Sequence, residues 1–336
     1  MKAIVCSEPH KFESTILPYP EKKEGYSIVK VKRIGICGTD LHAFEGTQPY
    51  FSYPRILGHE LACEIIESEG EFRVGDKVCI LPYFSCGQCV ACRNAKPNCC
   101  ASLKVFGVHI DGGMSEYISV PTSSLVASQG LDFDALALVE PLAIGAHGVR
   151  RAKIKTSDKV LVIGAGPIGL GIIQFAQIAG AEVIVMDINN DRLNFCKEVL
   201  GAKHLINPTE TDALEKIREI TSGDMANVVI DATGNLRAIN SGVSYLSHGG
   251  KFVLVGLQKG DISISHPEFH KREATMMSSR NATKADFEYV ISCILNKKIK
   301  PETYITHRVG FDEMIGNFES YLDPETGVIK AMVTLD

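Results

Sequence analysis

The sequence predicts an α/β protein in which an irregular β-rich region precedes a doubly wound parallel sheet of six strands. Two observations support this prediction. Up to about residue 140, short β-type runs are separated by glycine, proline and polar turns, as in a small β-rich domain. From residue 158 onward, apolar runs alternate with helical stretches, which is typical of parallel strands covered on both faces.

The individual elements follow from these patterns. Strands of the first region are expected at Ser27–Arg33, Ala62–Ile66, Lys77–Ile80 and Met114–Val120, and a helix over 142–152 joins it to the next. The six strands of the parallel sheet are expected at Val160–Ile163, Glu182–Met186, His204–Ile206, Val228–Ile230, Phe252–Val255 and Thr275–Ser278. The chain end adds a helix, Lys284–Leu295, and a strand, Ile329–Thr334, which we expect to fold back onto the first region.

Composition and charge narrow the classes of function. The 336 residues carry 35 basic and 40 acidic side chains, a net charge of −5 without a basic run, which argues against a nucleic-acid partner. No apolar stretch approaches the ~18–20 residues of a membrane span, and the N-terminal apolar run is too brief for a signal peptide. We therefore expect a cytoplasmic protein with no membrane partner, where clustered cysteines favour a metal over disulfides.

A glycine-rich turn predicts a dinucleotide site. VLVIGAGPIG, residues 160–169, follows a buried strand and opens an apolar helix, and a second strand ends in Asp187, 18 residues after Gly169. Glycines in this context allow a tight turn and close approach to a pyrophosphate at a helix N-terminus. Asp187 would accept hydrogen bonds from the ribose and repel a 2′-phosphate, which favours NAD over NADP; Arg192 is the residue that weakens this preference. The residues assigned to the cofactor are Gly164, Gly166, Pro167, Ile168, Gly169, Asp187, Arg192, Val255 and Gly256.

Five cysteines lie within residues 86–100, CGQCVACRNAKPNCC. Cys86, Cys89 and Cys92 with one later cysteine supply the four thiolates of a structural zinc site. An iron–sulfur cluster is the alternative, but its usual spacing places a cysteine directly before the proline, where this chain has Lys96. The spacing alone leaves open whether Cys99 or Cys100 is the fourth ligand. The remaining buried-type cysteines are expected to be small core residues: Cys6, Cys63, Cys79, Cys196 and Cys293.

A second group of ligand-type residues lies in GICGTDLH (35–42) and LGHE (57–60). Cys37 and His59 are metal ligands by type, and Glu60 and Glu140 could complete the shell. This HE is not the metalloprotease HExxH motif, because position 63 is Cys.

GICGTDLH, GHE, the four-cysteine loop and GAGPIG occur in this order, and with them the chain resembles the zinc-dependent medium-chain dehydrogenase/reductase family along essentially its whole length. The resemblance implies a GroES-like catalytic domain over 1–145 and 281–336, with a structural-zinc lobe at about 84–101. It also implies a Rossmann NAD-binding domain over 146–280 and an active site between the two domains. GTQPYFSYPR (46–55), GVHIDGG (107–113) and HPEFHKREATMMSSRNAT (266–283) look closest to L-galactonate oxidoreductases within this family.

The resemblance also implies roles for individual residues. It assigns a catalytic zinc to Cys37, His59 and Glu60, with Glu140 as an alternating ligand or water partner, and a second zinc to Cys86, Cys89, Cys92 and Cys100. Which of the two glutamates touches the resting metal stays open. Thr39 would take the substrate proton and pass it through the cofactor ribose to His42, and we expect Thr39 and Asp40 to cap the helix as well. We also expect Asp40 to hydrogen-bond His59 and fix its tautomer.

The substrate is the least constrained part of the prediction. Tyr50, Phe51 and Tyr53 could form an aromatic wall, with Gln48 and Arg55 as polar handles, and His109 could face the site. Arg280 is the candidate cation for a substrate carboxylate, with a structural ion pair as its alternative. The predicted reaction is NAD-dependent oxidation of a secondary hydroxyl on a sugar acid or polyol. The alternatives are an L-threonine or sorbitol dehydrogenase, or an NAD-binding regulator without chemistry; a homodimer or homotetramer is expected.

Overall fold

The computed structural model describes residues 1–335. Residue contacts divide the chain into two compact units, one formed by 1–140 with 281–336 and the other by 141–280. The division falls inside helix α4 (Val139–Ala152), between 140 and 141 rather than between 145 and 146. The reason is packing: Gly145 of α4 lies so close to Gly171 of α5 (Pro167–Ile178) that an added Cβ would meet the Gly171 carbonyl carbon at 2.9 Å.

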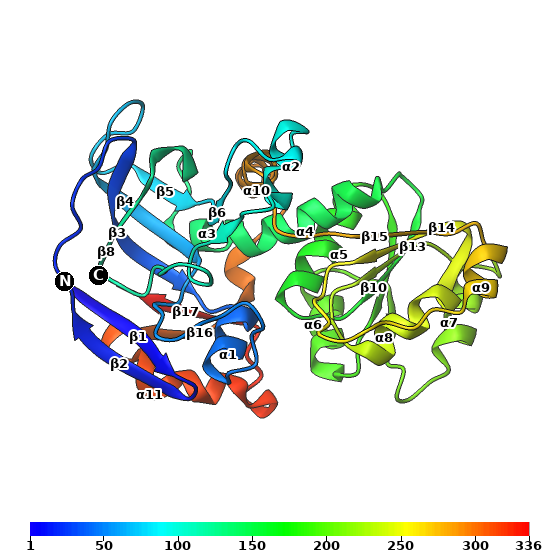
Figure 1. Cartoon of the computed structure of the whole chain (residues 1–336). Helices are drawn as coiled ribbons and strands as arrows, with labels where there is room; N and C mark the ends of the chain where they lie inside the picture. The colour runs from blue at the N-terminus through cyan, green and yellow to red at the C-terminus, as the bar shows by residue number, and fades with distance from the viewer. Residues whose placement is uncertain (336) are drawn as a thin grey trace. The chain divides into compact units, whose positions relative to one another are not determined.

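The first unit is built on a seven-stranded sheet whose central strand is β3 (Tyr26–Gly35) (Figure 1). β3 pairs with β17 (Lys330–Thr334), β4 (Glu60–Glu67) and β8 (Tyr117–Pro121), all antiparallel. The chain end thus folds back onto the N-terminal region, as its apolar strand predicted. The unit's other elements are β1 (Lys2–Glu8), β2 (Lys11–Ile16), α1 (Gly38–Phe44), β5 (Lys77–Ile80), β9 (Leu125–Ala127), α3 (Phe133–Ala137), α10 (Lys284–Leu295), β16 (Ile305–Gly310) and α11 (Met314–Phe318).

The cysteine-rich segment forms a small lobe of this unit. A two-stranded ribbon, β6 (Tyr83–Phe84) with β7 (Lys104–Val105), closes its base. Between the two strands lie only a single turn of helix, α2 (Val90–Arg93), and a 3-10 turn over Pro97–Cys99. Because so short a segment has little core of its own, we expect its shape to depend on a group bound by its cysteines.

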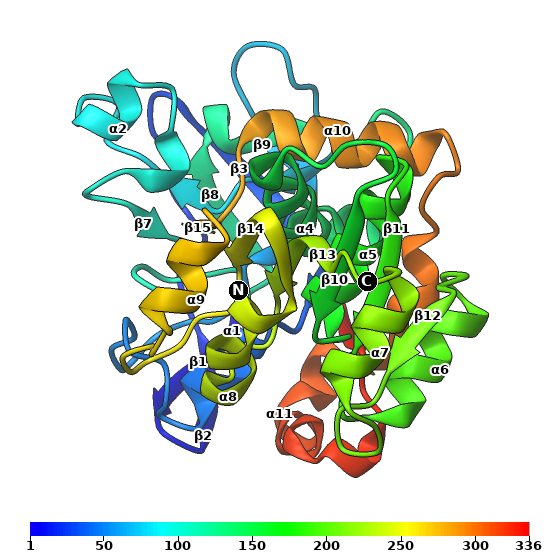
Figure 2. The same ribbon diagram turned by 90° about the vertical axis from the view of Figure 1, so that its right-hand side faces the viewer.

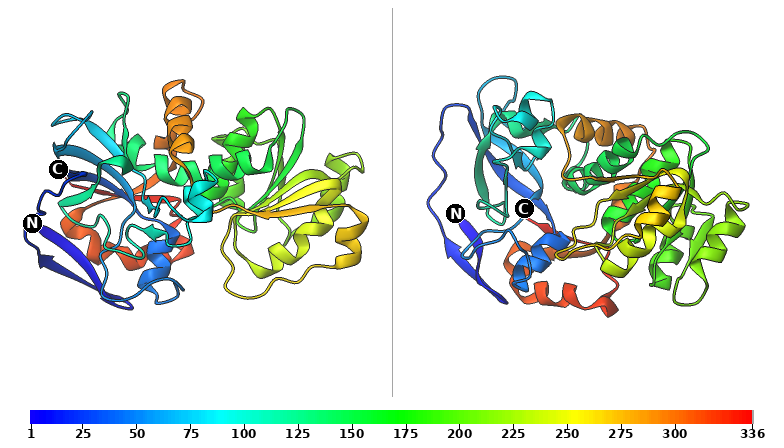
Figure 3. Two further views of the ribbon diagram at one scale, coloured as in Figure 1. Left: turned by 45° about the horizontal axis from the view of Figure 1, so that its top comes forward. Right: turned by 45° about the vertical axis from the view of Figure 1, so that its right-hand side comes forward.

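The second unit is a six-stranded parallel sheet in the order β12-β11-β10-β13-β14-β15 (Figure 2). This is the 3-2-1-4-5-6 order of the dinucleotide-binding fold, and it confirms the predicted doubly wound sheet. Helices lie on both faces of the sheet (Figure 3). Its elements are β10 (Lys159–Ile163), β11 (Glu182–Met186), α6 (Asn190–Glu198), β12 (His204–Ile206), α7 (Ala213–Ile220), β13 (Ala226–Asp231), α8 (Leu236–Ser241), β14 (Leu246–Leu254), α9 (His266–Lys271) and β15 (Thr275–Ser278).

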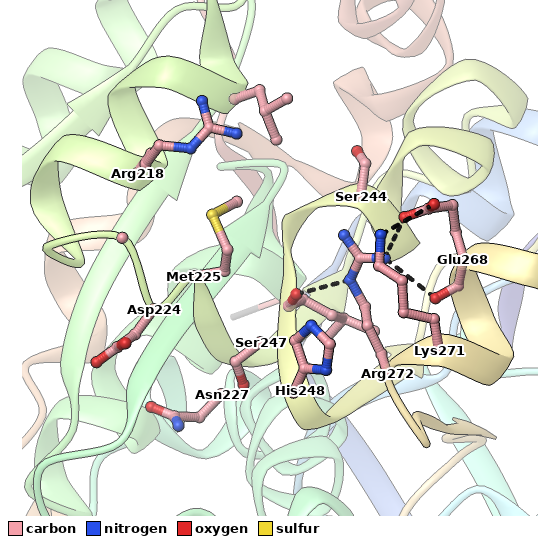
Figure 4. Close-up of a pocket in the computed structure, with 13 residues that line it drawn as sticks. Arg218, Asp224, Met225, Asn227, Ser244, Ser247, His248, Glu268, Lys271 and Arg272 are labelled. Carbon is pink, nitrogen blue, oxygen red and sulfur yellow. Dashed lines mark hydrogen bonds and ion pairs between the residues drawn. The ribbon is translucent and has the colours of Figure 1, made fainter.

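A cavity of about 820 Å³ opens at the amino ends of β13 and β14 in this unit (Figure 4). Dinucleotides bind at the carboxyl ends of parallel strands, so this cavity is on the wrong edge for the cofactor. Its cations are also neutralised within the protein, because Glu268 accepts from Arg272 at 2.5 Å and from Lys271 at 3.2 Å. We therefore place the functional site elsewhere. Among residues 1–335, no helix combines the length and apolar character needed to cross a membrane.

Candidate functional site

The first metal-ligand candidate, Cys37, is the N-cap residue of α1. Asp40, in the first turn of that helix, accepts a hydrogen bond from the Cys37 backbone N–H at 2.9 Å and from the Gly58 N–H at 3.2 Å. This fully buried carboxylate therefore joins the two turns that carry Cys37 and His59. Asp40 is thus the third residue of a capping box whose N-cap is Cys37, and Thr39 is not part of that box. Asp40 Oδ1 lies 3.6 Å from His59 Nδ1, which is within ion-pair range but too long for the expected hydrogen bond.

Three ligand-type side chains converge at this point. One ligand atom each of Cys37, His59 and Glu60 lies within 4.8 Å of the others. Nδ1 of His59 is buried without a hydrogen-bond partner. Burial by itself lowers the pKa of His59, but the charges of Asp40 and Cys37 outweigh it and raise the pKa well above its usual value. A thiolate, an imidazole and a carboxylate around one point are a donor set that suits zinc.

Glu60 has a partner that sequence reasoning missed. The side chain is fully buried, and Nζ of Lys330, 2% exposed, donates to its two oxygens at 2.7 and 2.6 Å and to the Ile36 carbonyl at 3.0 Å. Burial lowers the pKa of Lys330, but the charges of Glu60 and Cys37 raise it above its usual value. Gly35 leaves the room for this pair, since a Cβ there would lie 2.1 Å from Glu60 Oε2.

Glu140 lies near this group but outside it. The three-residue cluster does not include Glu140, and its Oε1 accepts a hydrogen bond from the hydroxyl of Tyr83. Burial raises the pKa of the Glu140 carboxyl to about 7, the charge of His59 opposes that rise, and the charge of Glu60 adds to it. The two glutamates therefore differ in partner: Glu60 is held by an ammonium and Glu140 by a phenol.

The two residues of the expected proton relay lie on α1, one turn apart. The His42 side chain is 61% exposed, with Nδ1 at 3.3 Å from Glu45 Oε2 and 3.3 Å from Thr47 Oγ1. An exposed imidazole can exchange protons with water, as the last member of a relay must. The relay from Thr39 to His42 stays a prediction.

The cysteine lobe brings four thiols together: Cys86, Cys89, Cys92 and Cys100. The Sγ atoms of Cys89 and Cys92 are 3.5 Å apart and those of Cys86 and Cys100 are 3.4 Å apart, which is too far for disulfides. The backbone N–H groups of Ala101 and Cys92 lower the pKa of the Cys89 thiol to about 6. Four converging sulfurs fit a tetrahedral metal.

The fifth cysteine of the lobe, Cys99, is exposed and lies outside this group. Cys100, its neighbour, is buried. The structure thus places Cys100 with the other three sulfurs, a choice that spacing alone left open. The cysteines expected in the core, Cys6, Cys63, Cys79, Cys196 and Cys293, are all buried.

The glycine loop of the second unit has the geometry that phosphates require. Gly164 has φ +101°, and Gly166 is the N-cap of α5, which continues through Pro167 and Ile168. A Cβ on Gly169 would lie 1.9 Å from the Gly164 carbonyl oxygen, so only glycine fits there. The N-terminus of α5 is thereby left accessible to an anion.

Asp187 and Arg192 flank this loop. Asp187 accepts one backbone hydrogen bond on each oxygen, from Ala165 N at 2.6 Å and Asn189 N at 2.9 Å. Each carboxylate oxygen retains a second lone pair for a ribose hydroxyl. Arg192 points towards the glycine loop, since its Nη1 would lie 3.8 Å from a Cβ on Gly166.

Two further cofactor candidates, Val255 and Gly256, follow β14. Their N–H groups both donate to the carbonyl oxygen of Asp231, at 2.9 and 3.1 Å. Gly256 packs against Gly234, where an added Cβ would meet the Gly234 nitrogen at 2.1 Å. These residues stay candidates for cofactor contact at the carboxyl ends of β13 and β14.

Of the substrate candidates, Tyr50 and His109 lie together. Their rings stack with centroids 6.2 Å apart, and Nδ1 of His109 accepts from the Val105 N–H at 3.0 Å. Phe51 packs instead on Tyr53, at 4.8 Å between centroids. The two expected polar handles both have partners within the protein: Gln48 Oε1 accepts from the Tyr50 N–H at 3.4 Å, and Arg55 contacts Asp111 at 3.4 Å and Ser52 at 3.0 Å. Arg280 is exposed after β15 in the second unit.

Comparison with known proteins identifies the family. Residues 23–130 match the alcohol dehydrogenase GroES-like domain, and residues 167–296 match the zinc-binding dehydrogenase domain. The chain belongs to the zinc-binding alcohol dehydrogenase family. This dehydrogenase is 42% identical over 339 residues to the L-galactonate-5-dehydrogenase of Escherichia coli K12, covering 99% of each chain. It is 34% identical over 344 residues to a sorbitol dehydrogenase of Halalkalibacterium halodurans, again covering 99% of each chain.

A solved relative supports the same assignment. The alcohol dehydrogenase rspB of Escherichia coli CFT073, crystallised with NADH, aligns with 100% of this dehydrogenase at a TM-score of 0.93 and 32% identity, over 99% of its own chain. A zinc-binding dehydrogenase of Sinorhizobium meliloti, crystallised with NADP, aligns at a TM-score of 0.91 and 28% identity, over 99% of each chain. The GroES-like and Rossmann domains predicted from the sequence are therefore confirmed.

Proposed function

We propose that this dehydrogenase transfers a hydride from a secondary hydroxyl of a sugar acid or polyol to NAD, with L-galactonate as the best single candidate. The observation that carries the proposal is the convergence of Cys37, His59 and Glu60 in a chain that also has a dinucleotide-type glycine loop. The similarity to an L-galactonate-5-dehydrogenase over the whole chain supports the substrate class.

The three converging side chains would hold a catalytic zinc. A zinc ion bound there supplies Lewis acidity, which makes a hydroxyl more acidic and its carbon a better hydride donor. Asp40 fixes the two turns that carry Cys37 and His59, and Lys330 neutralises Glu60 where no metal is bound. Glu140 is positioned beside this group as a second carboxylate.

Proton release is assigned to α1. Oγ1 of Thr39 would accept the proton of the substrate hydroxyl while it donates its own proton onward, and the exposed imidazole of His42 would release a proton to water. Cys86, Cys89, Cys92 and Cys100 would hold a second zinc whose role is structural, because four thiolates leave no open position for a substrate.

The cofactor preference rests on Asp187. Its carboxylate, held by two backbone N–H groups beside the glycine loop, faces the region where a ribose would bind. A 2′-phosphate would be repelled by this charge, so NAD is the proposed cofactor, although a relative has been crystallised with NADP.

A substrate screen tests this function. Purified enzyme is incubated with NAD and, separately, L-galactonate, L-idonate, sorbitol and L-threonine, and NADH is followed by absorbance. We expect the highest kcat/KM with a sugar acid, and a lower value for the Arg280→Ala variant if that cation recognises the carboxylate. Oxidation of L-threonine alone would overturn the substrate assignment, and an L-threonine 3-dehydrogenase of Pyrococcus abyssi is indeed 32% identical.

The assembly and location are also proposals. A homodimer or homotetramer is what the family resemblance implies, and a cytoplasmic location is what the clustered cysteines favour. Light scattering of the purified chain and fractionation of producing cells test these two points.

A further inference from the structure

Tyr83 is a buried tyrosine that the proposed chemistry does not use. Its side chain is 7% exposed and its hydroxyl donates to Oε1 of Glu140, which is 5% exposed. A hydroxyl that donates to a buried carboxylate fixes which oxygen is engaged and where the other one points. Tyr83 therefore determines the orientation of the Glu140 side chain.

The position of Tyr83 in the chain also connects this hydrogen bond to the cysteine lobe. Tyr83 lies on β6, which pairs with β7 through the register Tyr83↔Val105 and Phe84↔Lys104. This ribbon closes the base of the four-cysteine lobe, and Cys86 lies two residues after the end of β6. The Cys86 N–H donates to Cys100 Sγ at 3.3 Å, so the cysteine cluster holds the two ends of the lobe together. The backbone position of Tyr83 thus depends on the lobe.

The two glutamates near the catalytic cluster have separate holders. Glu60, inside the cluster, has both oxygens on Lys330, whereas Glu140, outside the cluster, is held through one oxygen by Tyr83. Without the phenol, Glu140 would be a buried carboxylate lacking its donor, beside an imidazole and an open metal position. A buried carboxylate without a hydrogen-bond donor is stabilised by a nearby cation, so Glu140 would turn towards a metal bound at the cluster.

We propose that Tyr83 is a positioning residue that holds Glu140 beside the Cys37–His59–Glu60 site rather than in it, and that it links the four-cysteine lobe to that site. The inference rests on the proposed metal at this cluster but not on the identity of the substrate. It predicts that the lobe affects catalysis through one hydrogen bond as well as through stability.

Cobalt substitution tests the proposal without any substrate. Co²⁺ replaces zinc in full-length protein, and the visible spectrum is compared for wild type, Tyr83→Phe and the control Tyr321→Phe, which removes the hydroxyl of another buried tyrosine in the same unit. Because four-coordinate Co²⁺ absorbs more strongly than five- or six-coordinate Co²⁺, entry of Glu140 lowers the visible intensity. We expect that loss in Tyr83→Phe only, with a fall in kcat of about tenfold at nearly constant KM.

A double variant separates positioning from general damage. In a Glu140→Gln background the anionic ligand is gone, so adding Tyr83→Phe is expected to leave the cobalt spectrum unchanged. An unchanged spectrum in Tyr83→Phe alone, or an equal change with and without Glu140→Gln, overturns the proposal. Should Tyr83→Phe fail to fold, Cys92→Ser is used in its place. With Co²⁺ at the Cys37 site, this variant is expected to show the same loss of visible intensity. A wild-type intensity would overturn the proposed link between the lobe and that site. Lack of turnover with every polyol would refute the proposed substrate class while the spectrum still decides the role of Tyr83.

Discussion

Replacing Lys330 with Met leaves a buried carboxylate without its counter-charge. Glu60 is fully buried, and both of its oxygens accept from Lys330 Nζ at 2.6–2.7 Å. Removing one partner of a buried ion pair costs about 3–5 kcal/mol. For a unit of this size, each kcal/mol corresponds to about 2–4 °C, so we expect a melting temperature lower by roughly 6–20 °C.

A bound metal ion should reduce the destabilisation caused by Lys330→Met. With zinc bound, Glu60 regains a cation, so Lys330→Met should cost clearly less than in chelator-treated protein. The assay is thermal unfolding by circular dichroism with and without zinc, with Lys251→Met as the control, since that lysine donates only to the Ala152 carbonyl at 2.7 Å. Adding Glu60→Gln should restore much of the stability of the chelated variant. A melting temperature equal to that of wild type without metal would refute this reasoning.

Three further predictions concern the cysteine lobe, the cofactor site and the ion pairs of Asp134. Cys92→Ser should release one metal ion and lower the melting temperature, whereas Cys99→Ser should have the metal content and melting temperature of wild type. Equal effects in the two variants would exclude a metal in the lobe. Asp187→Ser should raise the ratio of kcat/KM for NADP to kcat/KM for NAD by about tenfold, measured from initial rates. An unchanged ratio would show that this carboxylate does not select the cofactor. Asp134, whose pKa is held below its usual value by Arg308 and Arg33 despite burial, contributes stability above about pH 4 that is lost as pH falls through its folded pKa. Asp134→Asn should therefore cost about 1–2 kcal/mol in chemical denaturation at pH 7 and progressively less as pH falls below about 4, and a pH-independent difference would contradict this contribution of the ion pairs.

The elements that one local sequence pattern determines could be predicted from the sequence. The six parallel strands were each found as apolar runs, and the glycine loop was found because its turn, helix and acidic strand end occur in one short stretch. Strands such as β2 and β16, KFESTI and ITHRVG, were missed because they are mostly polar and pair at the edges of the sheets.

The rest of the site depends on contacts between distant segments. Lys330 lies 270 residues from Glu60, and Tyr83 lies 57 residues from Glu140. A lysine in an apolar closing strand, KAMVT, was the one available signal, because a strand buried on both faces rarely holds an unpaired charge. Asp40 shows the same limit: its own turn is local, but the Gly58 N–H that donates to its second oxygen belongs to a distant segment, and His59 lies at ion-pair distance rather than hydrogen-bond distance.

Zinc content measured together with NADH formation tests the central claim most directly. The claim is that Cys37, His59 and Glu60 hold the metal that makes a hydroxyl carbon a hydride donor beside NAD. We predict two zinc ions per wild-type chain, one for each cysteine-containing cluster, and one zinc ion with no NADH formation in Cys37→Ser, at a nearly unchanged circular dichroism spectrum. A Cys37→Ser protein that keeps both zinc ions, or that still reduces NAD at the wild-type rate, would contradict it.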